Sequence, residues 1–126
     1  MIITHVIGGL GNQMFQYAIG RALSFTRGVP LRLDTQDFEG YALHNGFELE
    51  RIFNIDGQQA SGSDLRKVLG WRAFSPIRRR LFRRQLARFR GPSLFVDHLT
   101  GQRPQISAMP DMSYLMGNWQ SEKYFK

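Results

Sequence analysis

The hydrophobic positions change period near the N-terminus, which predicts a strand followed by a helix. Residues 1–7 form a short apolar run rich in β-branched side chains, which is typical of a buried strand. From Asn12 to about Thr26, apolar residues recur at helical spacing and predict an amphipathic helix. The Asn12 side chain is suited to cap this helix, and Gly28 is suited to the position just past its end. Between the strand and the helix, residues 8–11 form a turn that contains three glycines.

A second apolar alternation predicts a parallel partner for the first strand. Leu31 and Leu33 alternate with Arg32, and a strand–helix–strand order gives a parallel pair with a right-handed crossover. We therefore expect an α/β fold, a Rossmann-like parallel sheet with flanking helices. Ligands of such sheets bind beyond the carboxyl ends of the strands, so the glycine turn and Asp34 fall on one rim. Asp34 is a candidate binding residue, although an Asx turn or a helix cap explains it at least equally well.

Later in the chain, short apolar runs predict strands at residues 94–96 and 114–116, and residues 75–90 predict a basic amphipathic helix. Pro76 suits the first turn of that helix, and seven arginines lie beside its apolar stripe. The helix could pack its stripe on the domain, contact anionic lipid headgroups or an acidic glycolipid, or bind nucleic acid. Nucleic acid is the least favoured partner, because exposed aromatics spaced for stacking and zinc-finger or RNP signatures are absent from the sequence.

Charge and composition narrow the classes of site. Ten Lys or Arg residues and no acidic residue lie between Arg66 and Arg90, whereas the rest of the 126-residue chain carries seven basic and ten acidic residues. The chain has no cysteine, which excludes disulfides and thiolate metal sites. His5, His44 and His98 have no paired spacing, so we expect no metal site. No apolar run approaches the roughly 20 residues of a membrane-spanning helix. Since a secretory signal pattern is also absent, we expect a cytoplasmic location.

The glycine turn has a chemistry of its own. A helix that begins beside glycines presents backbone N–H groups and a partial positive charge, which can hold a phosphate or pyrophosphate. The spacing differs from a dinucleotide fingerprint, and Asn12 and Gln13 stand where a P-loop has Lys and then Ser or Thr. Two amides favour neutral hydrogen bonding to hydroxyls and phosphate oxygens. A tight turn of any α/β domain explains the glycines equally well.

Three blocks of the sequence together resemble one enzyme family. Residues 8–18 read Gly-Gly-Leu-Gly-Asn-Gln-Met-Phe-Gln-Tyr-Ala, which is similar to the N-terminal signature of glycosyltransferase family 11, the α-1,2-fucosyltransferases. Residues 33–55 and 114–125 resemble the family's next segment and its later Gly-aromatic-Gln-Ser-Glu-Lys-Tyr-Phe block, in the same order. The resemblance covers residues 1–60 and 113–126.

The resemblance implies a reaction and a set of binding residues. The family transfers L-fucose from GDP-fucose to the 2-hydroxyl of a galactoside with inversion, without a metal or cofactor, on a GT-B arrangement of two Rossmann-like domains. Gly9, Gly11, Asn12 and Gln13 match the first motif, which is expected beside the diphosphate and sugar. Trp119 and Gln120 match the third motif, where Trp119 could stack on a sugar or, more in keeping with its type, be a core aromatic. The resemblance names no general base in this chain, so the catalytic residues stay unassigned.

One family motif is absent. The family has a His-x-Arg-Arg-Gly-Asp-Tyr motif in its donor-binding half, and this sequence does not contain it. We therefore expect residues 1–126 to form the N-terminal, acceptor-side domain of a bacterial enzyme, truncated before the donor-binding domain and inactive alone. The alternative is a non-catalytic glycan- or membrane-surface-binding domain of the same fold. In either case the basic segment, Ser75 to Arg90, could contact an anionic membrane at its inner face.

Overall fold

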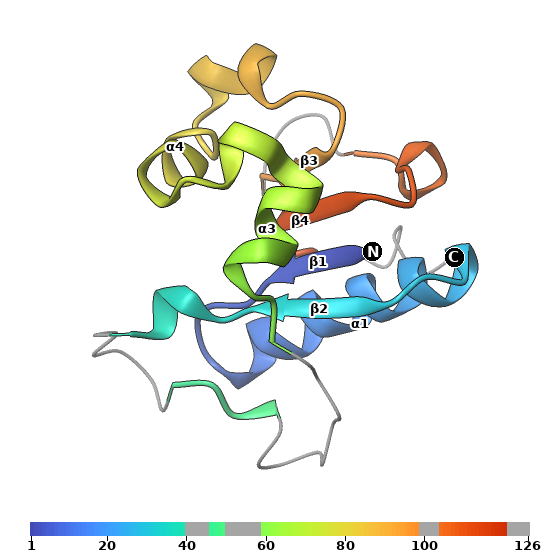
Figure 1. Ribbon diagram of the computed structural model, residues 1–126. Coiled ribbons are helices and arrows are strands. Elements are labelled where there is room, and N and C mark those ends of the chain that lie inside the picture. The colour runs from blue at the N-terminus through green and yellow to red at the C-terminus, as the bar shows by residue number, and fades with distance from the viewer. Residues whose placement is uncertain (40–45, 50–58, 99–103, 121–126) are drawn as a thin grey trace.

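The computed structural model describes residues 1–39, 46–49, 59–98 and 104–120, and its centre is a parallel sheet (Figure 1). The strand order is β2-β1-β4-β3, and each neighbouring pair is parallel. The strands are β1 (Ile2–His5), β2 (Leu31–Asp34), β3 (Leu94–Asp97) and β4 (Ser113–Gly117). The predicted α/β class and the parallel β1–β2 pair are confirmed.

Strand β1 lies inside the sheet and is buried on both faces. Its four residues are all buried, and its last residue, His5, lies opposite Asp34 of β2. Side chains alternate along a strand, so Ile2 packs in one hydrophobic cluster and Ile3 in the other. This placement fits the unbroken apolar run of residues 1–7, which is typical of strands in parallel sheets.

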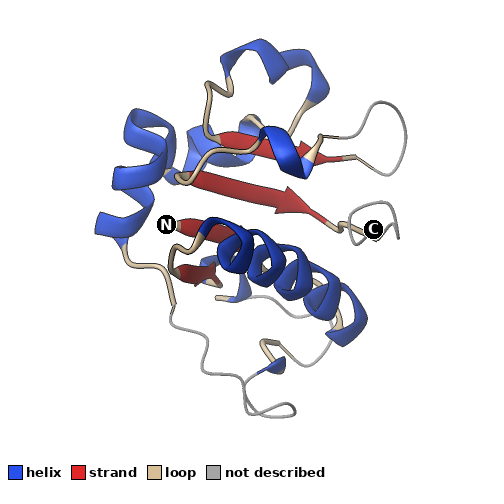
Figure 2. Ribbon diagram, turned by 90° about the vertical axis from the view of Figure 1, so that its right-hand side faces the viewer, coloured by secondary structure: helices blue, strands red, loops and turns tan. Residues whose placement is uncertain are grey.

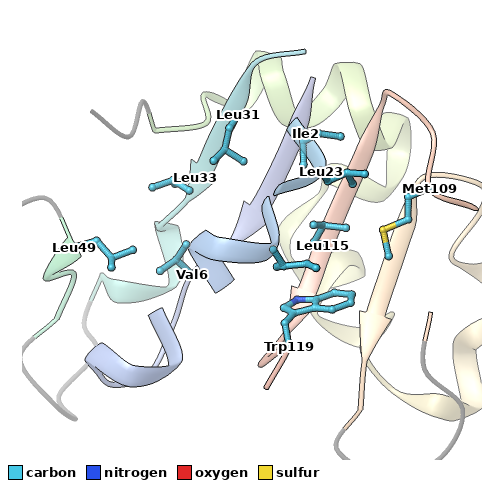
Figure 3. Close-up of a cluster of buried hydrophobic side chains, with 10 residues drawn as sticks. Ile2, Val6, Leu23, Leu31, Leu33, Leu49, Met109, Leu115 and Trp119 are labelled. Carbon is cyan, nitrogen blue, oxygen red and sulfur yellow. The ribbon is translucent and has the colours of Figure 1, made fainter. Parts of the chain in front are cut away.

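Helix α1 (Leu10–Arg27) covers one face of the sheet and helix α3 (Gly62–Leu69) covers the other (Figure 2). Ile19 and Leu23 of α1 belong to the cluster drawn in Figure 3, which also contains Leu115 of β4. Leu65 and Val68 of α3 belong to the opposite cluster. The two helices therefore enclose the strands in two apolar layers.

The two ends of α1 differ in how well the sequence predicted them. Gly28 lies in the left-handed conformation and its N–H contacts the last carbonyls, as predicted. The prediction that Asn12 caps the N-terminus is wrong, because the helix begins at Leu10 and extended Gly9 is the N-cap. The N–H of Gln13 donates to the Gly9 carbonyl at 3.0 Å, so Asn12 already lies in the first turn.

The single helix predicted for residues 75–90 is also wrong. Helix α4 spans only Ser75–Arg80, and a 3₁₀ segment, η3, spans Arg84–Phe89. The Arg90 guanidinium donates to the carbonyl oxygens of Leu81, Phe82 and Arg83 at 2.7, 3.1 and 3.3 Å. In a continuous helix those carbonyls would accept backbone N–H groups four residues later. Here the Arg90 side chain donates to the carbonyls that follow the last turn of α4, and the Arg83 carbonyl also accepts the N–H of Leu86 at 3.1 Å.

Helix α3 was not predicted, although the sequence carries a signal for it. Ser61 and Asp64 form a capping box, in which each side chain accepts the other residue's backbone N–H, at 3.1 and 3.0 Å. Shorter 3₁₀ segments complete the described chain. They are η1 (Gln36–Phe38), η2 (Gly70–Ala73) and η4 (Ile106–Ala108). Among the described residues, the helices fall short of the length and apolarity that crossing a bilayer requires.

Candidate functional site

A pocket of about 280 Å³ opens at the carboxyl rim of the sheet. It lies where the ends of β1 and β4 meet, with β2 on one side of this pair and β3 on the other. This is the rim where open parallel sheets bind their ligands. Its lining comprises His5, Ile7, Gln16, Asp37, Arg79, Phe82, Met116, Gly117 and Asn118.

The buried Gln16 side chain of α1 lines the pocket. Its Oε1 accepts the N–H of Ile7 at 3.0 Å, and its Nε2 donates to the carbonyl of Gly117 at 3.0 Å. One amide thus satisfies a backbone group just past β1 and another at the end of β4. The two central strands are joined at the point where their own pairing ends.

Gln13, one helical turn earlier, braces the glycine turn in the same way. Its fully buried side chain donates to the carbonyls of Gly8 and Gly46, at 2.9 and 2.7 Å, and accepts the N–H of Glu48 at 3.0 Å. The side chain predicted to contact a ligand is therefore occupied by the protein's own backbone. Its amide holds the loop residue Gly46 against the turn.

Asp34 also lies inside the domain. Its fully buried carboxylate accepts the Tyr114 hydroxyl at 2.5 Å and the N–H of Gln36 at 3.2 Å, and lies 3.5 Å from the Nε of buried Arg78. The Gln36 contact is the Asx turn foreseen as the alternative to a binding role. Burial, followed by the charge of Asp34, raises the pKa of Tyr114 well above its ordinary value. This network attaches α4 to the sheet and does not line the pocket.

The pocket wall contains a histidine–carboxylate pair that the sequence did not reveal. Nε2 of His5 lies 2.7 Å from Oδ2 of Asp37, and Arg79 donates to the other carboxylate oxygen at 2.7 Å. The hydrogen bond from His5, and then that from Arg79, holds the pKa of Asp37 well below its ordinary value. His5 ends β1 opposite Asp34, and Asp37 follows Asp34 by three residues. Strand register was therefore the signal that could have brought His5 and Asp37 together.

The outer part of the rim brings two sequence blocks together. Nε2 of Gln120 donates to Oδ1 of Asn12, so the first and third blocks meet beside the start of α1. Gly11 is exposed there and Gly9 is half-buried. Because the first bond of α1 runs from Gln13 N–H to Gly9, the N–H groups of residues 10–12 point out of the helix end.

Trp119 takes the core alternative. Its side chain is fully buried in the cluster of Figure 3, and its backbone N–H donates to Oδ2 of Asp97 at 3.0 Å. Its φ of 60° lies in the left-handed region, which is unusual for a bulky residue. This turn directs the ring inward and the next side chain, Gln120, outward to the rim. Of the candidate residues, Gly9, Gly11, Asn12 and Gln120 therefore share the rim, while Gln13, Asp34 and Trp119 lie beneath it.

The sequence predicted no metal site, and the structure bears on that prediction only for the residues that it describes. Within residues 1–39, 46–49, 59–98 and 104–120, no three His, Asp or Glu side chains gather as a metal site. The predictions that involve His44, and Ser121 onward in the third block, lie outside the described residues.

The chain is similar to one sugar transferase over part of its length. It is 48% identical over 56 residues to an alpha-1,2-colitosyltransferase from Escherichia coli, which covers 44% of this chain and 19% of that protein. The match therefore spans about a fifth of the relative's length. No family model and no solved structure matches the chain. The likeness supports a glycosyltransferase role.

Proposed function

We propose that this chain is the N-terminal, acceptor-side half of a galactoside α-1,2-fucosyltransferase of glycosyltransferase family 11. In this proposal the complete enzyme has the GT-B arrangement and transfers L-fucose from GDP-fucose to the 2-hydroxyl of a galactoside, with inversion and without a metal. The observation that carries the proposal is the 48% identity to an alpha-1,2-colitosyltransferase over 56 residues. The pocket at the carboxyl rim of the sheet, and the contact of Asn12 with Gln120, also support it.

In this proposal the start of α1 and the pocket at the ends of β1 and β4 have different roles. The N–H groups at the start of α1, residues 10–12, can donate to a diphosphate or to sugar hydroxyls, and Asn12 adds an amide. The pocket at the ends of β1 and β4 is lined by the His5–Asp37 pair. A developing charge on a departing nucleotide needs fixed donors of this kind when no metal is present. The arginine motif that binds the nucleotide in the family is absent from this sequence, so we expect the chain alone to transfer little sugar.

A chimera tests the proposal. Residues 1–120 joined to the C-terminal part of the E. coli colitosyltransferase should transfer fucose or colitose from its GDP derivative to lactose, while the 126-residue chain should not. In the chimera, Asn12→Ala should lower kcat/KM by about 10²-fold, the size expected for one preorganised donor. Met14→Ala, on the exposed side of the same helix, should change it less than twofold.

The alternative is a non-catalytic glycan-binding domain. The observation that favours it is the pocket at the rim, which could hold a sugar without any reaction. Saturation-transfer NMR of lactose with the 126-residue chain separates the two functions. Lactose binding by the chain, together with a folded chimera that transfers no sugar, would replace the transferase proposal with the binding domain. Robust transfer by the chain alone would overturn the division into two halves.

A further inference from the structure

Three large aromatic side chains are exposed on one part of the basic segment. Trp71 is 60% exposed, Phe74 is 64% exposed and Phe89 is 45% exposed. We refer to these three residues, with Arg72 and Arg88, as the aromatic–arginine surface. It is formed by η2 and the end of η3, and Figure 1 shows this segment at the opposite end of the molecule from α1.

Direct contacts hold these side chains together. The N–H of Phe74 donates to the carbonyl of Trp71, and side chains three residues apart in a 3₁₀ turn lie on the same side. The Arg72 guanidinium lies 4.2 Å from the centre of the Trp71 ring and donates from Nε to the Phe89 carbonyl at 2.7 Å. The Arg88 guanidinium lies 4.9 Å from the centre of the Phe89 ring. The surface is thus one connected patch from two segments of the chain.

The charged residues of the segment that carries this patch have a single sign. Between Arg66 and Arg90 the sequence has ten basic residues and no acidic one. Arg78 lies inside the domain, Arg79 is paired with Asp37, and Arg90 ends helix α4. The remaining cations are exposed or half-buried. They are Arg66, Lys67, Arg72, Arg80, Arg83, Arg84 and Arg88.

We propose that the aromatic–arginine surface docks the protein on an anionic lipid bilayer. Trp and Phe rings prefer the interface between headgroups and acyl chains, and a surrounding of Arg and Lys is attracted to anionic headgroups. The contact differs from the amphipathic helix expected from the sequence, because Leu81 of its apolar stripe is buried in the core. Nucleic acid fits less well, since guanidinium groups already lie over the Trp71 and Phe89 rings that bases would stack on.

The two tryptophans provide a direct readout. Trp119 is fully buried and Trp71 is exposed, so a change in emission on adding vesicles reports Trp71. The 126-residue chain should show a blue shift with vesicles of 70% phosphatidylcholine and 30% phosphatidylglycerol, and quenching when the lipids carry bromine on their acyl chains. Vesicles of phosphatidylcholine alone should bind at least tenfold more weakly. Raising NaCl from 0.1 to 0.5 M should weaken binding to the anionic vesicles, because the Debye length shortens.

Matched variants test which surface is used. Phe74→Ser with Phe89→Ser should weaken sedimentation with the anionic vesicles at least tenfold, and Arg88→Gln should weaken it several-fold. The controls lie on α1: Phe25→Ser removes a ring that is 86% exposed, and Arg21→Gln removes an exposed cation. Circular dichroism verifies that each variant is folded.

Several outcomes would overturn the docking proposal. They are equal binding to neutral and anionic vesicles, an unchanged Trp71 emission, equal weakening by Phe25→Ser and by the Phe74–Phe89 variant, or binding of duplex DNA without binding of vesicles. None of these results depends on sugar transfer, so the membrane proposal and the transferase proposal succeed or fail separately.

Discussion

At the scale of single residues, the rim depends on polar side chains that the protein uses internally. Gln13 and Gln16 lie three positions apart on α1, and their amides satisfy backbone groups of the glycine turn and of the ends of β1 and β4. Buried backbone groups left without a partner each cost about 1–3 kcal/mol. A motif rich in amides therefore carries a large structural role, and of the proposed ligand contacts only Asn12, Gln120 and the helix start lie at the surface of the rim.

The Asp37 carboxylate makes the stability of the pocket wall depend on pH. Its pKa is lowered from an ordinary value of 3.8 by hydrogen bonds from His5 and Arg79. A group with a lowered folded-state pKa contributes stability above its unfolded pKa and loses it as pH falls toward the folded value. We expect the urea midpoint of the protein to fall steadily as the pH is lowered from about 4 to 2.5.

Asp37→Asn should be less stable than the parent at pH 6 and should show a smaller loss between pH 4 and 2.5. Asp111→Asn, at an exposed position, should follow the parent across the range. The measurement is urea unfolding followed by circular dichroism at each pH. Parallel curves for the parent and Asp37→Asn would show that the His5–Asp37–Arg79 contacts add nothing to the folded state.

At the scale of elements, the packing of α1 on the sheet rests on one glycine. A Cβ added at Gly20 would come within 2.1 Å of the Thr4 Oγ1 and 2.9 Å of the Leu31 side chain. Alanine there would gain up to about 1 kcal/mol of helix propensity, but overpacking a buried contact costs about 1–3 kcal/mol. We expect Gly20→Ala to lower the free energy of unfolding by about 1–2 kcal/mol.

Gly11 provides the matched control, because it lies in the same helix with no atom within 4 Å of an added Cβ. Gly11→Ala should leave stability unchanged or raise it by less than about 1 kcal/mol. Denaturant unfolding of both variants measures the difference. Equal effects of the two substitutions would show that the helix can move away from β1 and β2 without penalty.

The elements also show what sequence alone could predict. Strands β1 and β2 and helix α1 were predicted because their periodicity is local and strong, and their pairing follows from the βαβ order. The end of α4 could not be read locally, because it depends on the Arg90 side chain reaching back to carbonyls up to nine residues away. The burial of Asp34 depends on Tyr114, eighty residues later. Capping signals such as the Ser61–Asp64 box were available and would have identified α3.

At the scale of the whole molecule, structure and charge divide the chain into two regions. The sheet has its core on both sides of β1, and two apolar clusters contain most of the buried side chains. The segment from η2 to η3 packs on one of these clusters through Ile77, Leu81 and Leu86, and its outer side exposes rings and cations. The pocket lies between the two regions, since β1 and β4 form one wall and Arg79 and Phe82 form another. A ligand of the pocket would therefore contact both.

This division predicts two levels of hydrogen-exchange protection. Amides of Ile3–His5 and Leu115–Met116 lie in strands paired on both sides, so their exchange requires opening of the whole sheet. Amides of residues 84–89 belong to an exposed 3₁₀ segment and should exchange by local opening, at least 10²-fold faster. Mass spectrometry of peptides covering the two regions measures the ratio. Equal protection would mean that η3 unfolds with the core, whereas slower exchange of residues 84–89 on adding anionic vesicles would locate the docking surface on that segment.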